Sequence, residues 1–428
     1  NSGDVKAFID GASSIATGGI DMDADQSSRT IAISAGLAGA TGKKGIAIAG
    51  SMSFNQIHTD VEVSLGNITT AAGNSGSVSM NASDDSNVVI VAGAAGFGSK
   101  AGVGAAFAYS DLQNDVRALV TNVSNLKHTG LFEVKARTDT DVVTVTGAGG
   151  IAKGAGGGSS FGLAGTVSVN LIDNEVIAAI DNSSTHADST GNVVLQAIDN
   201  SYFFAFAGAV GYGGTVGLGA AVAVNIMTNE VRASVTNSDI DTTGQFKLLA
   251  QETATVTSIS VGGAGSKKFA IAGGISANDF TNVTQAYVSG GSHIDVDGLV
   301  EIKAIDDTQI VSIAGGLSFS QKGAVGASVG VNLIDNDIRA YVDGSVVIST
   351  GATTTIQADA GNLIVAIGIG GAGGTKFALG GSVSINEITN TVEAGVRNAS
   401  TVLSADTIDI SARDNSTMVV VAGGFAGS

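Results

Sequence analysis

The stretch Thr215–Val235, TVGLGAAVAVNIMTNEVRASV, decides the fold of this chain. From Val216 to Val224, large apolar residues alternate with glycine and alanine. Because successive side chains of a strand point to opposite faces, this period of two indicates an extended strand. Asn225–Asn229 then predicts a short turn into a second strand, Val231–Val235, because asparagine tolerates turn geometry.

The same phrase recurs along the chain and divides it into units. It reads VSVNLIDNEVIAAI at Val167–Ile180, VGVNLIDNDIRAYV at Val329–Val342 and VSINEITNTVEAGV at Val383–Val396. The units are about 54 residues long, and they start near Asp4, Asp60, Asp115, Glu175, Glu230, Val283, Asp337 and Thr391. We therefore expect a single repeat array over residues 1–428, and a fragment of a longer chain, because the last unit is incomplete.

Each unit contains four extended segments. They are separated by a variable polar loop, a polar corner and a Gly/Lys tip. One unit cannot bury its apolar face alone, but stacked units share a continuous core. The fold class that we predict is all-β, a repetitive parallel β-solenoid of about eight units. The alternative is a string of tandem antiparallel β modules, because the Gly/Lys tips resemble hairpin loops.

The third and fourth segments of each unit alternate large side chains with very small ones. Phe204 and Phe206, for example, lie opposite Ala205 and Ala207. A solvent-facing sheet would alternate apolar with polar residues, and this one does not. We expect the large face to be the core, and the flat Gly/Ala face to pack against another sheet.

Composition narrows the classes of function. The formal net charge is −18, which argues against a nucleic-acid partner because phosphate binding needs a basic surface. The chain has no Cys, so disulfides and thiolate metal sites are excluded. Glycine numbers 62 while proline is absent, as expected for sheets in which nearly every backbone N–H is bonded.

Asparagine recurs at two fixed positions of the unit. Side-chain amides stacked at a strand spacing of about 4.8 Å can form a hydrogen-bonded ladder, although a plain turn role is the alternative. The first series comprises Asn55, Asn170, Asn225, Asn278, Asn332 and Asn386. The second series comprises Asn114, Asn174, Asn229, Asn282, Asn336 and Asn390.

Charged residues recur at two further positions. Stacked acidic corners suggest calcium as the one cofactor, with Asp84, Asp199, Asp306 and Asp414 as ligands. The tips concentrate lysine, which predicts either a solvated edge or an edge that docks on acidic groups of a neighbouring chain. The tip lysines are Lys43, Lys44, Lys100, Lys153, Lys267, Lys268, Lys322 and Lys376.

The phrase V-x-V-N-x-x-x-N-x-V-x-A with Gly/Ala-rich strands resembles the repeat regions of large bacterial surface and secreted adhesins. These are the filamentous-haemagglutinin-like and autotransporter-passenger-like β-solenoid proteins, and the resemblance implies an extracellular or cell-surface location and a role in adhesion. We expect a structural protein that assembles with itself, laterally or end to end, into a filament, sheath or adhesin fibre through flat Gly/Ala faces and strand edges. We expect neither an enzyme nor membrane insertion. The alternative is a module that binds a ligand or a cell-surface glycan through variable loops such as Asn182–Gly191 and Ser289–Gly298.

Overall fold

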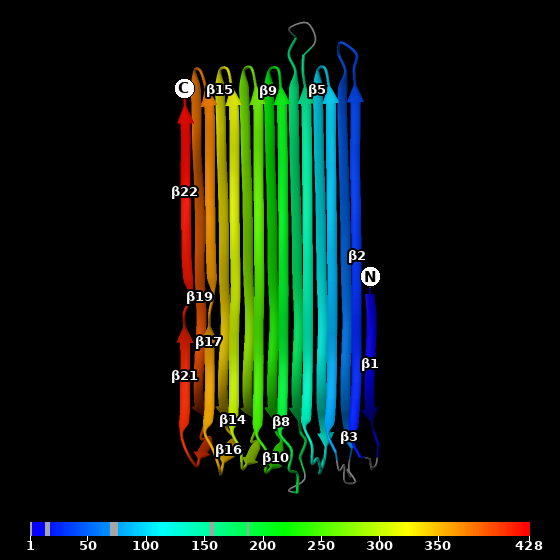
Figure 1. Ribbon diagram of the computed structural model, residues 1–428, viewed down its shortest axis with the longest axis vertical. Coiled ribbons are helices and arrows are strands. Elements are labelled where there is room, and N and C mark those ends of the chain that lie inside the picture. Colours follow the sequence, from blue (N-terminus) through cyan, green and yellow to red (C-terminus); the bar gives the residue numbers. More distant parts are fainter. Residues whose placement is uncertain (1, 13–17, 69–75, 155–157, 186–187) are drawn as a thin grey trace.

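The structure is a stack of parallel coils, which confirms the β-solenoid prediction (Figure 1). It is a computed structural model that describes residues 2–12, 18–68, 76–154, 158–185 and 188–428. No helix among these residues is long and apolar enough to cross a membrane. The two ends of the chain lie at opposite edges of the stack.

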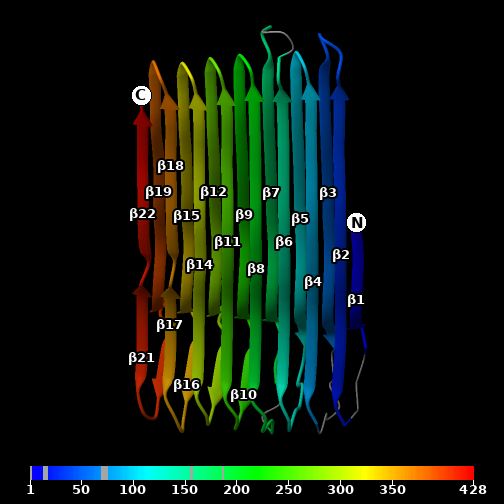
Figure 2. The same cartoon turned by 45° about the horizontal axis from the view of Figure 1, so that its top comes forward.

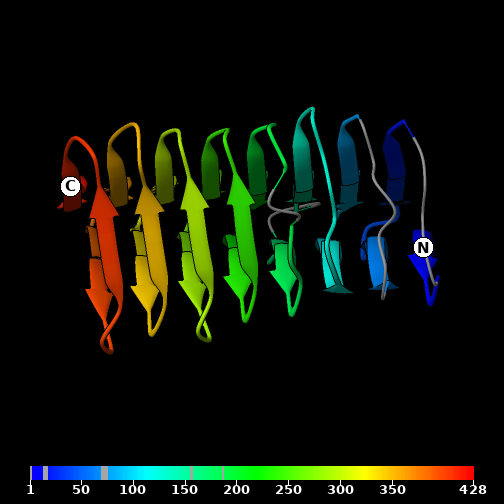
Figure 3. The same cartoon turned by 90° about the horizontal axis from the view of Figure 1, so that it is seen from below.

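Three sheets run through the stack (Figures 1 and 2). Sheet A contains β1 (Ser2–Asp10), β3 (Ile46–Ile68), β5 (Ala101–Val123), β7 (Phe161–Asp181), β9 (Val216–Thr236), β12 (Phe269–Ser289), β15 (Gly323–Asp343) and β19 (Phe377–Arg397). Sheet B contains β2 (Ile20–Ala40), β4 (Val78–Gly98), β6 (Phe132–Ala152), β8 (Val193–Gly213), β11 (Phe246–Ser266), β14 (Val300–Ser320), β17 (Thr354–Ala360) with β18 (Leu363–Gly374), and β21 (Ile408–Asp414) with β22 (Thr417–Gly427). The short base sheet contains β10 (Asp239–Thr242), β13 (His293–Val296), β16 (Val346–Ser349) and β20 (Thr401–Ser404), and Figure 3 views the stack from this base.

One coil follows a strand of sheet B to the tip, turns, and returns along a strand of sheet A to the base. Every pairing between coils is parallel and in register, so equivalent residues of successive units lie side by side, as Asn278 does with Asn225 and Asn332. Tandem antiparallel modules would not pair in this way. The eight unit starts, from Asp4 to Thr391, share one row across sheet A.

The expected turn at Asn225–Asn229 was wrong, because both asparagines lie inside the continuous strand β9. The polar corner after Ala197 likewise lies inside β8. The four expected segments therefore form two long strands per coil in most of the stack. Among the described residues, a strand ends at the expected polar corner in sheet B alone, between β17 and β18 and between β21 and β22. In-register stacking bonds every backbone group here, which removes the need for a bend.

The space between sheets A and B narrows from base to tip, and the inward side chains shrink with it. Along β9 the buried residues pass from Val235 and Val231 through Met227 and Ala221 to Gly217. Near the tip the backbones almost touch, since a Cβ added to Gly219 would lie 2.0 Å from the carbonyl oxygen of Gly263. Only glycine fits at Gly219 itself, whereas the neighbouring coils carry Ala164 and Ala272 in the same row.

The prediction that the large apolar face forms the core was therefore wrong for the tip half. Phe204, Leu218 and Val222 point outward and are only partly buried, while Ala205 and Gly217 lie inside. The inward Gly/Ala faces of the two sheets cover each other within one molecule, so they are not available to a second molecule. The outer surface of the tip half is instead an apolar band on both sheets.

Candidate functional site

Four groups of residues carry the candidate functions: an asparagine ladder, a buried carboxylate layer, a hollow at the base and the tip half. The ladder joins Asn170, Asn225, Asn278, Asn332 and Asn386, which are bonded in sequence through their side chains. Each Nδ2 donates to the Oδ1 of the next coil towards the C-terminus, over 2.7–2.8 Å. Asn55 lies outside this ladder and donates to Ser53, because Ser110 separates it from Asn170 in the row.

The second asparagine series has a different role over most of the stack. Only Asn114 donates to the next amide, that of Asn174, over 3.1 Å. Further along, Asn229 donates to both Asp199 and Glu252, over 3.0 and 3.1 Å. Of the remaining members, Asn174 donates to Asp199, and Asn282, Asn336 and Asn390 donate to Asp306 or Asp414. This series therefore holds acidic residues of the facing sheet.

Three of those acidic residues form a buried layer. Asp199, Glu252 and Asp306 occupy one row of sheet B in consecutive coils, and all three are fully buried. Burial raises the pKa of Asp199 and of Asp306 to about 7. Burial and the charges of Asp199 and Asp306 raise the pKa of Glu252 well above its usual range. Protonated carboxyls and amides can satisfy one another here without a cation.

The expected calcium ligands divide into buried and exposed positions. Asp84, like Asp199 and Asp306, points inward, and burial raises its pKa to about 6, whereas Asp414 is exposed. Among the described residues, no three acidic or histidine side chains converge as a metal ion would require. The physical cause is the inward direction of the row, which sets Asp199 and Asp306 against asparagine and Asp84 against hydroxyl groups such as that of Ser86.

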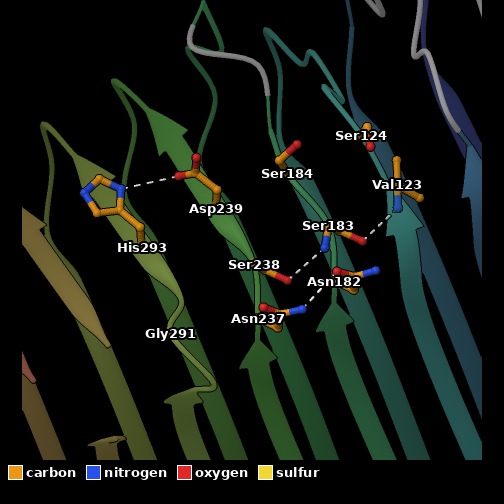
Figure 4. A pocket seen from close by; sticks show the side chains of 10 residues that line it. All are labelled: Val123, Ser124, Asn182, Ser183, Ser184, Asn237, Ser238, Asp239, Gly291 and His293. Atoms are coloured by element: carbon orange, nitrogen blue, oxygen red, sulfur yellow. Dashed lines mark hydrogen bonds and ion pairs between the residues drawn. The ribbon is translucent and has the colours of Figure 1, made fainter. Parts of the chain in front are cut away.

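A polar hollow of about 410 Å³ lies among the base loops (Figure 4). It is lined by Val123, Ser124, Asn182, Ser183, Ser184, Asn237, Ser238, Asp239, Gly291 and His293. These residues come from four successive coils, which the register brings side by side. His293 Nδ1 lies 3.3 Å from Asp239 Oδ1, and both side chains are largely exposed. Hydroxyl, amide, imidazole and carboxylate groups here offer both donors and acceptors to a ligand.

Two serines of this hollow are held by hydrogen bonds to the backbone. Ser183 and Ser238 each donate the hydroxyl hydrogen to a backbone carbonyl two residues earlier, that of Asp181 or Thr236. Their oxygens accept backbone N–H groups of the preceding coil. They serve as structural links between coils.

Sequence reasoning missed a second asparagine ladder, at the start of the base loops. Asn67, Asn122, Asn182 and Asn237 all have positive φ, and each donates its amide to the preceding coil, opposite in direction to the interior ladder. Asn398 does the same to Asp343. The equivalent residues of the other coils, Gly11, Gly290 and Gly344, also have positive φ. The sequence could have indicated this ladder, because this position holds only asparagine or glycine, which adopt positive φ most readily.

The tip half presents charge at its end and apolar side chains on its flanks. All eight tip lysines are exposed, and they lie in the turns at one end of the stack. On sheet A the apolar band extends from Ile46 to Phe54, which is about 27 Å along the strand. Exposure reaches 71% at Ile48 and 55% at Phe269. Sheet B carries a similar band, with Ile33 and Phe319 exposed.

Comparison with protein-family models, with curated proteins and with solved structures finds no match to this chain.

Proposed function

We propose that this chain is a structural protein of the cell surface or the extracellular space, and that it assembles laterally with copies of itself into a filament, sheath or adhesin stalk. The observation that carries the proposal is the pair of uncovered apolar bands. Each band covers about 900 Å², because it extends about 27 Å along the strands and about 34 Å across coils spaced at about 4.8 Å. Soluble monomers rarely expose contiguous apolar patches of more than a few hundred Å².

The rest of the molecule agrees with a structural role. Ladders of amides and serines link each coil to the next, and the in-register sheets resist local opening. The residues of the base hollow are bonded to one another in ways that fix the stack. Neither an enzymatic reaction nor a resident cofactor belongs to this proposal.

Electron microscopy and sedimentation of the purified chain test the proposal. We expect filaments, sheets or discrete oligomers whose size increases with protein concentration. A chain that stays monomeric at every concentration, with both apolar bands in water, would refute lateral assembly.

A second candidate function rests on the polar hollow at the base. Its exposed His293 and Asp239 begin the base strands β13 and β10, and with Asn237 they could bind a cell-surface glycan through hydrogen bonds to hydroxyl groups. A glycan array tests it, with His293→Ala and Asp239→Ala expected to remove any binding that the parent chain shows. Binding that survives both substitutions would place the ligand elsewhere.

A further inference from the structure

The apolar band of sheet A has a groove and a ridge that run along the stack. The groove row consists of Gly50, Ala105, Gly165, Ala220, Gly273, Ala327 and Gly381. The ridge row, two residues further along each strand, consists of Met52, Phe107, Val167, Val222, Ile275, Val329 and Val383. A hollow of about 460 Å³ follows both rows over four coils. The groove is open, since a Cβ added at Gly165 or Gly381 would meet no atom within 4 Å.

These two rows are complementary to themselves. A second copy can be turned by a half rotation about an axis that is parallel to the stack and lies midway between the rows. The ridge row of each copy then faces the groove row of the other. Both rows repeat at the coil spacing of about 4.8 Å, so side chains and gaps match coil by coil. The strands of the two copies run in opposite directions.

The same rotation brings the tip lysines over acidic residues at the far border of the apolar band. Asp111 lies eleven positions after Lys100, as do Asp279 after Lys268 and Glu387 after Lys376, and Asp335 lies thirteen positions after Lys322. Along a strand these separations are about 36–43 Å, too far for contact within one copy. In the rotated pair, each lysine lies beside the acidic residue of its own coil in the other copy.

Neither the lysines nor the acidic residues of these pairs have an oppositely charged partner among the described residues. None of these lysines and acids takes part in the ion pairs that the described residues form. The acids one row closer to the base do, as Asp60 with Arg117, Glu230 with Arg232 and Asp337 with Arg339. Burial, followed by repulsion from Asp115 and Asp111, raises the pKa of Asp173, which no cation offsets in the single copy.

The charges match in most coils. The coil of β7 has Asp173 at this border, but its tip lysine, Lys153, follows β6 of sheet B and is not in the row of Lys100. The coil of β9 has no lysine at its tip and carries Ile226 and Thr228 at the border. The coil with Lys43 and Lys44 is a second exception, with Gln56 and His58. A lipid surface would gain nothing from this matching, so it favours a protein partner with the same repeat.

We propose that two copies of this chain pair through the outer face of sheet A, with antiparallel strands and coils in register. The pairing rests on the proposed function, because it names the first contact of the assembly. The contact covers about 34 by 27 Å, or about 900 Å² per copy, and stable interfaces bury about 800 Å² per partner.

Filling the groove tests the pairing. Gly165→Val, Gly273→Val and Gly381→Val together should raise the dimer dissociation constant at least about 100-fold in sedimentation, because the ridge can no longer enter. The fold should persist, because the added Cβ atoms meet only ordinary contacts. The matched control is Gly93→Val, Gly147→Val and Gly315→Val on the outer face of sheet B, where the added Cβ atoms also meet only ordinary contacts, and it should leave the sheet A dimer unchanged. Equal effects of the two triple variants would overturn the proposal.

Cross-linking tests the orientation of the two copies. The chain has no native cysteine, so only the introduced cysteines can form a disulfide. Lys322→Cys mixed with Asp335→Cys should give a disulfide-linked dimer on mild oxidation, whereas Lys322→Cys alone should not. Cross-linking of Lys322→Cys with itself would mean that tips lie side by side, which contradicts the antiparallel pair but leaves lateral assembly intact. A monomer that floats with phosphatidylcholine vesicles would overturn both the pair and the proposed function.

Discussion

Replacing the buried Asp306 by asparagine should stabilise the protein at pH 8. Its carboxylate accepts hydrogen bonds from Thr308 and Asn336, both over 2.8 Å, in a site without exposed surface. Burial raises its pKa from 3.8 to about 7. Asparagine has nearly the same shape and carries no charge at any pH. The oxygens of Asn282 and Asn336, which have no hydrogen-bond partner among the described residues, can accept the new amide hydrogens.

The direction and size of this change in stability follow from the linkage between proton binding and folding. Between pH 4 and pH 7 the folded state binds the proton of Asp306 and the unfolded state has lost it, so stability falls as the pH rises. The loss is complete above the folded pKa, and a rise of this size corresponds to about 4 kcal/mol at about 1.4 kcal/mol per pKa unit. We therefore expect Asp306→Asn to raise the free energy of unfolding at pH 8 by up to about 4 kcal/mol, and to change it little near pH 4.

Urea unfolding followed by circular dichroism, at intervals from pH 4 to pH 8, measures this difference. The exposed Asp409→Asn serves as the matched control and should leave the curve of the parent chain unchanged. A parent chain whose stability does not fall between pH 5 and pH 8, or a variant that is no more stable at pH 8, would refute the reasoning.

Three further predictions concern the interior and the metal. Asn278→Ala should destabilise the stack by about 2–4 kcal/mol, because it removes two ladder bonds and leaves two buried partners unsatisfied, while the exposed Thr281→Ala should cost little in the same urea titration. Gly104→Ala should lower the free energy of unfolding by at least about 1–3 kcal/mol, because its Cβ would lie 2.2 Å from a carbonyl oxygen of the facing sheet, while Gly147→Ala on the open outer face should not. Adding calcium or EDTA should leave the melting temperature unchanged, because the carboxylates of the acidic row are mostly buried against amides. A melting temperature that rises with calcium would show that the acidic row binds the metal.

The sequence predicts the stack and its register well, because the repeat is a local pattern that needs no knowledge of distant contacts. Asparagine at a fixed position of nearly every unit indicates axial neighbours, and Asn225, Asn278 and Asn332 are such neighbours. The hydrogen-bond partners of the second series could not be read in the same way. They depend on the facing strand, and nothing local to Asn229 specifies Glu252.

The inside and outside of the tip half were assigned wrongly, although the sequence contained the answer. Glu230 and Arg232 face solvent, so Val231 faces inward, and an unbroken strand carries that alternation to Gly217. The turn expected at Asn225 interrupted this alternation, so the residues before it were assigned to the wrong faces. Side-chain size alone could not decide, because the inner face is set by how closely the two sheets approach, and neither face of the tip half is polar.

The two asparagine ladders have opposite directions, and this has an electrostatic consequence. Interior amides such as Asn225 donate towards the C-terminal coil, whereas loop amides such as Asn237 donate towards the N-terminal coil. Each row alone would add its carboxamide dipoles into one moment that grows with the number of coils. Where both rows join the same two coils, as Asn170 with Asn225 and Asn182 with Asn237, the opposed dipoles largely cancel and add little axial field.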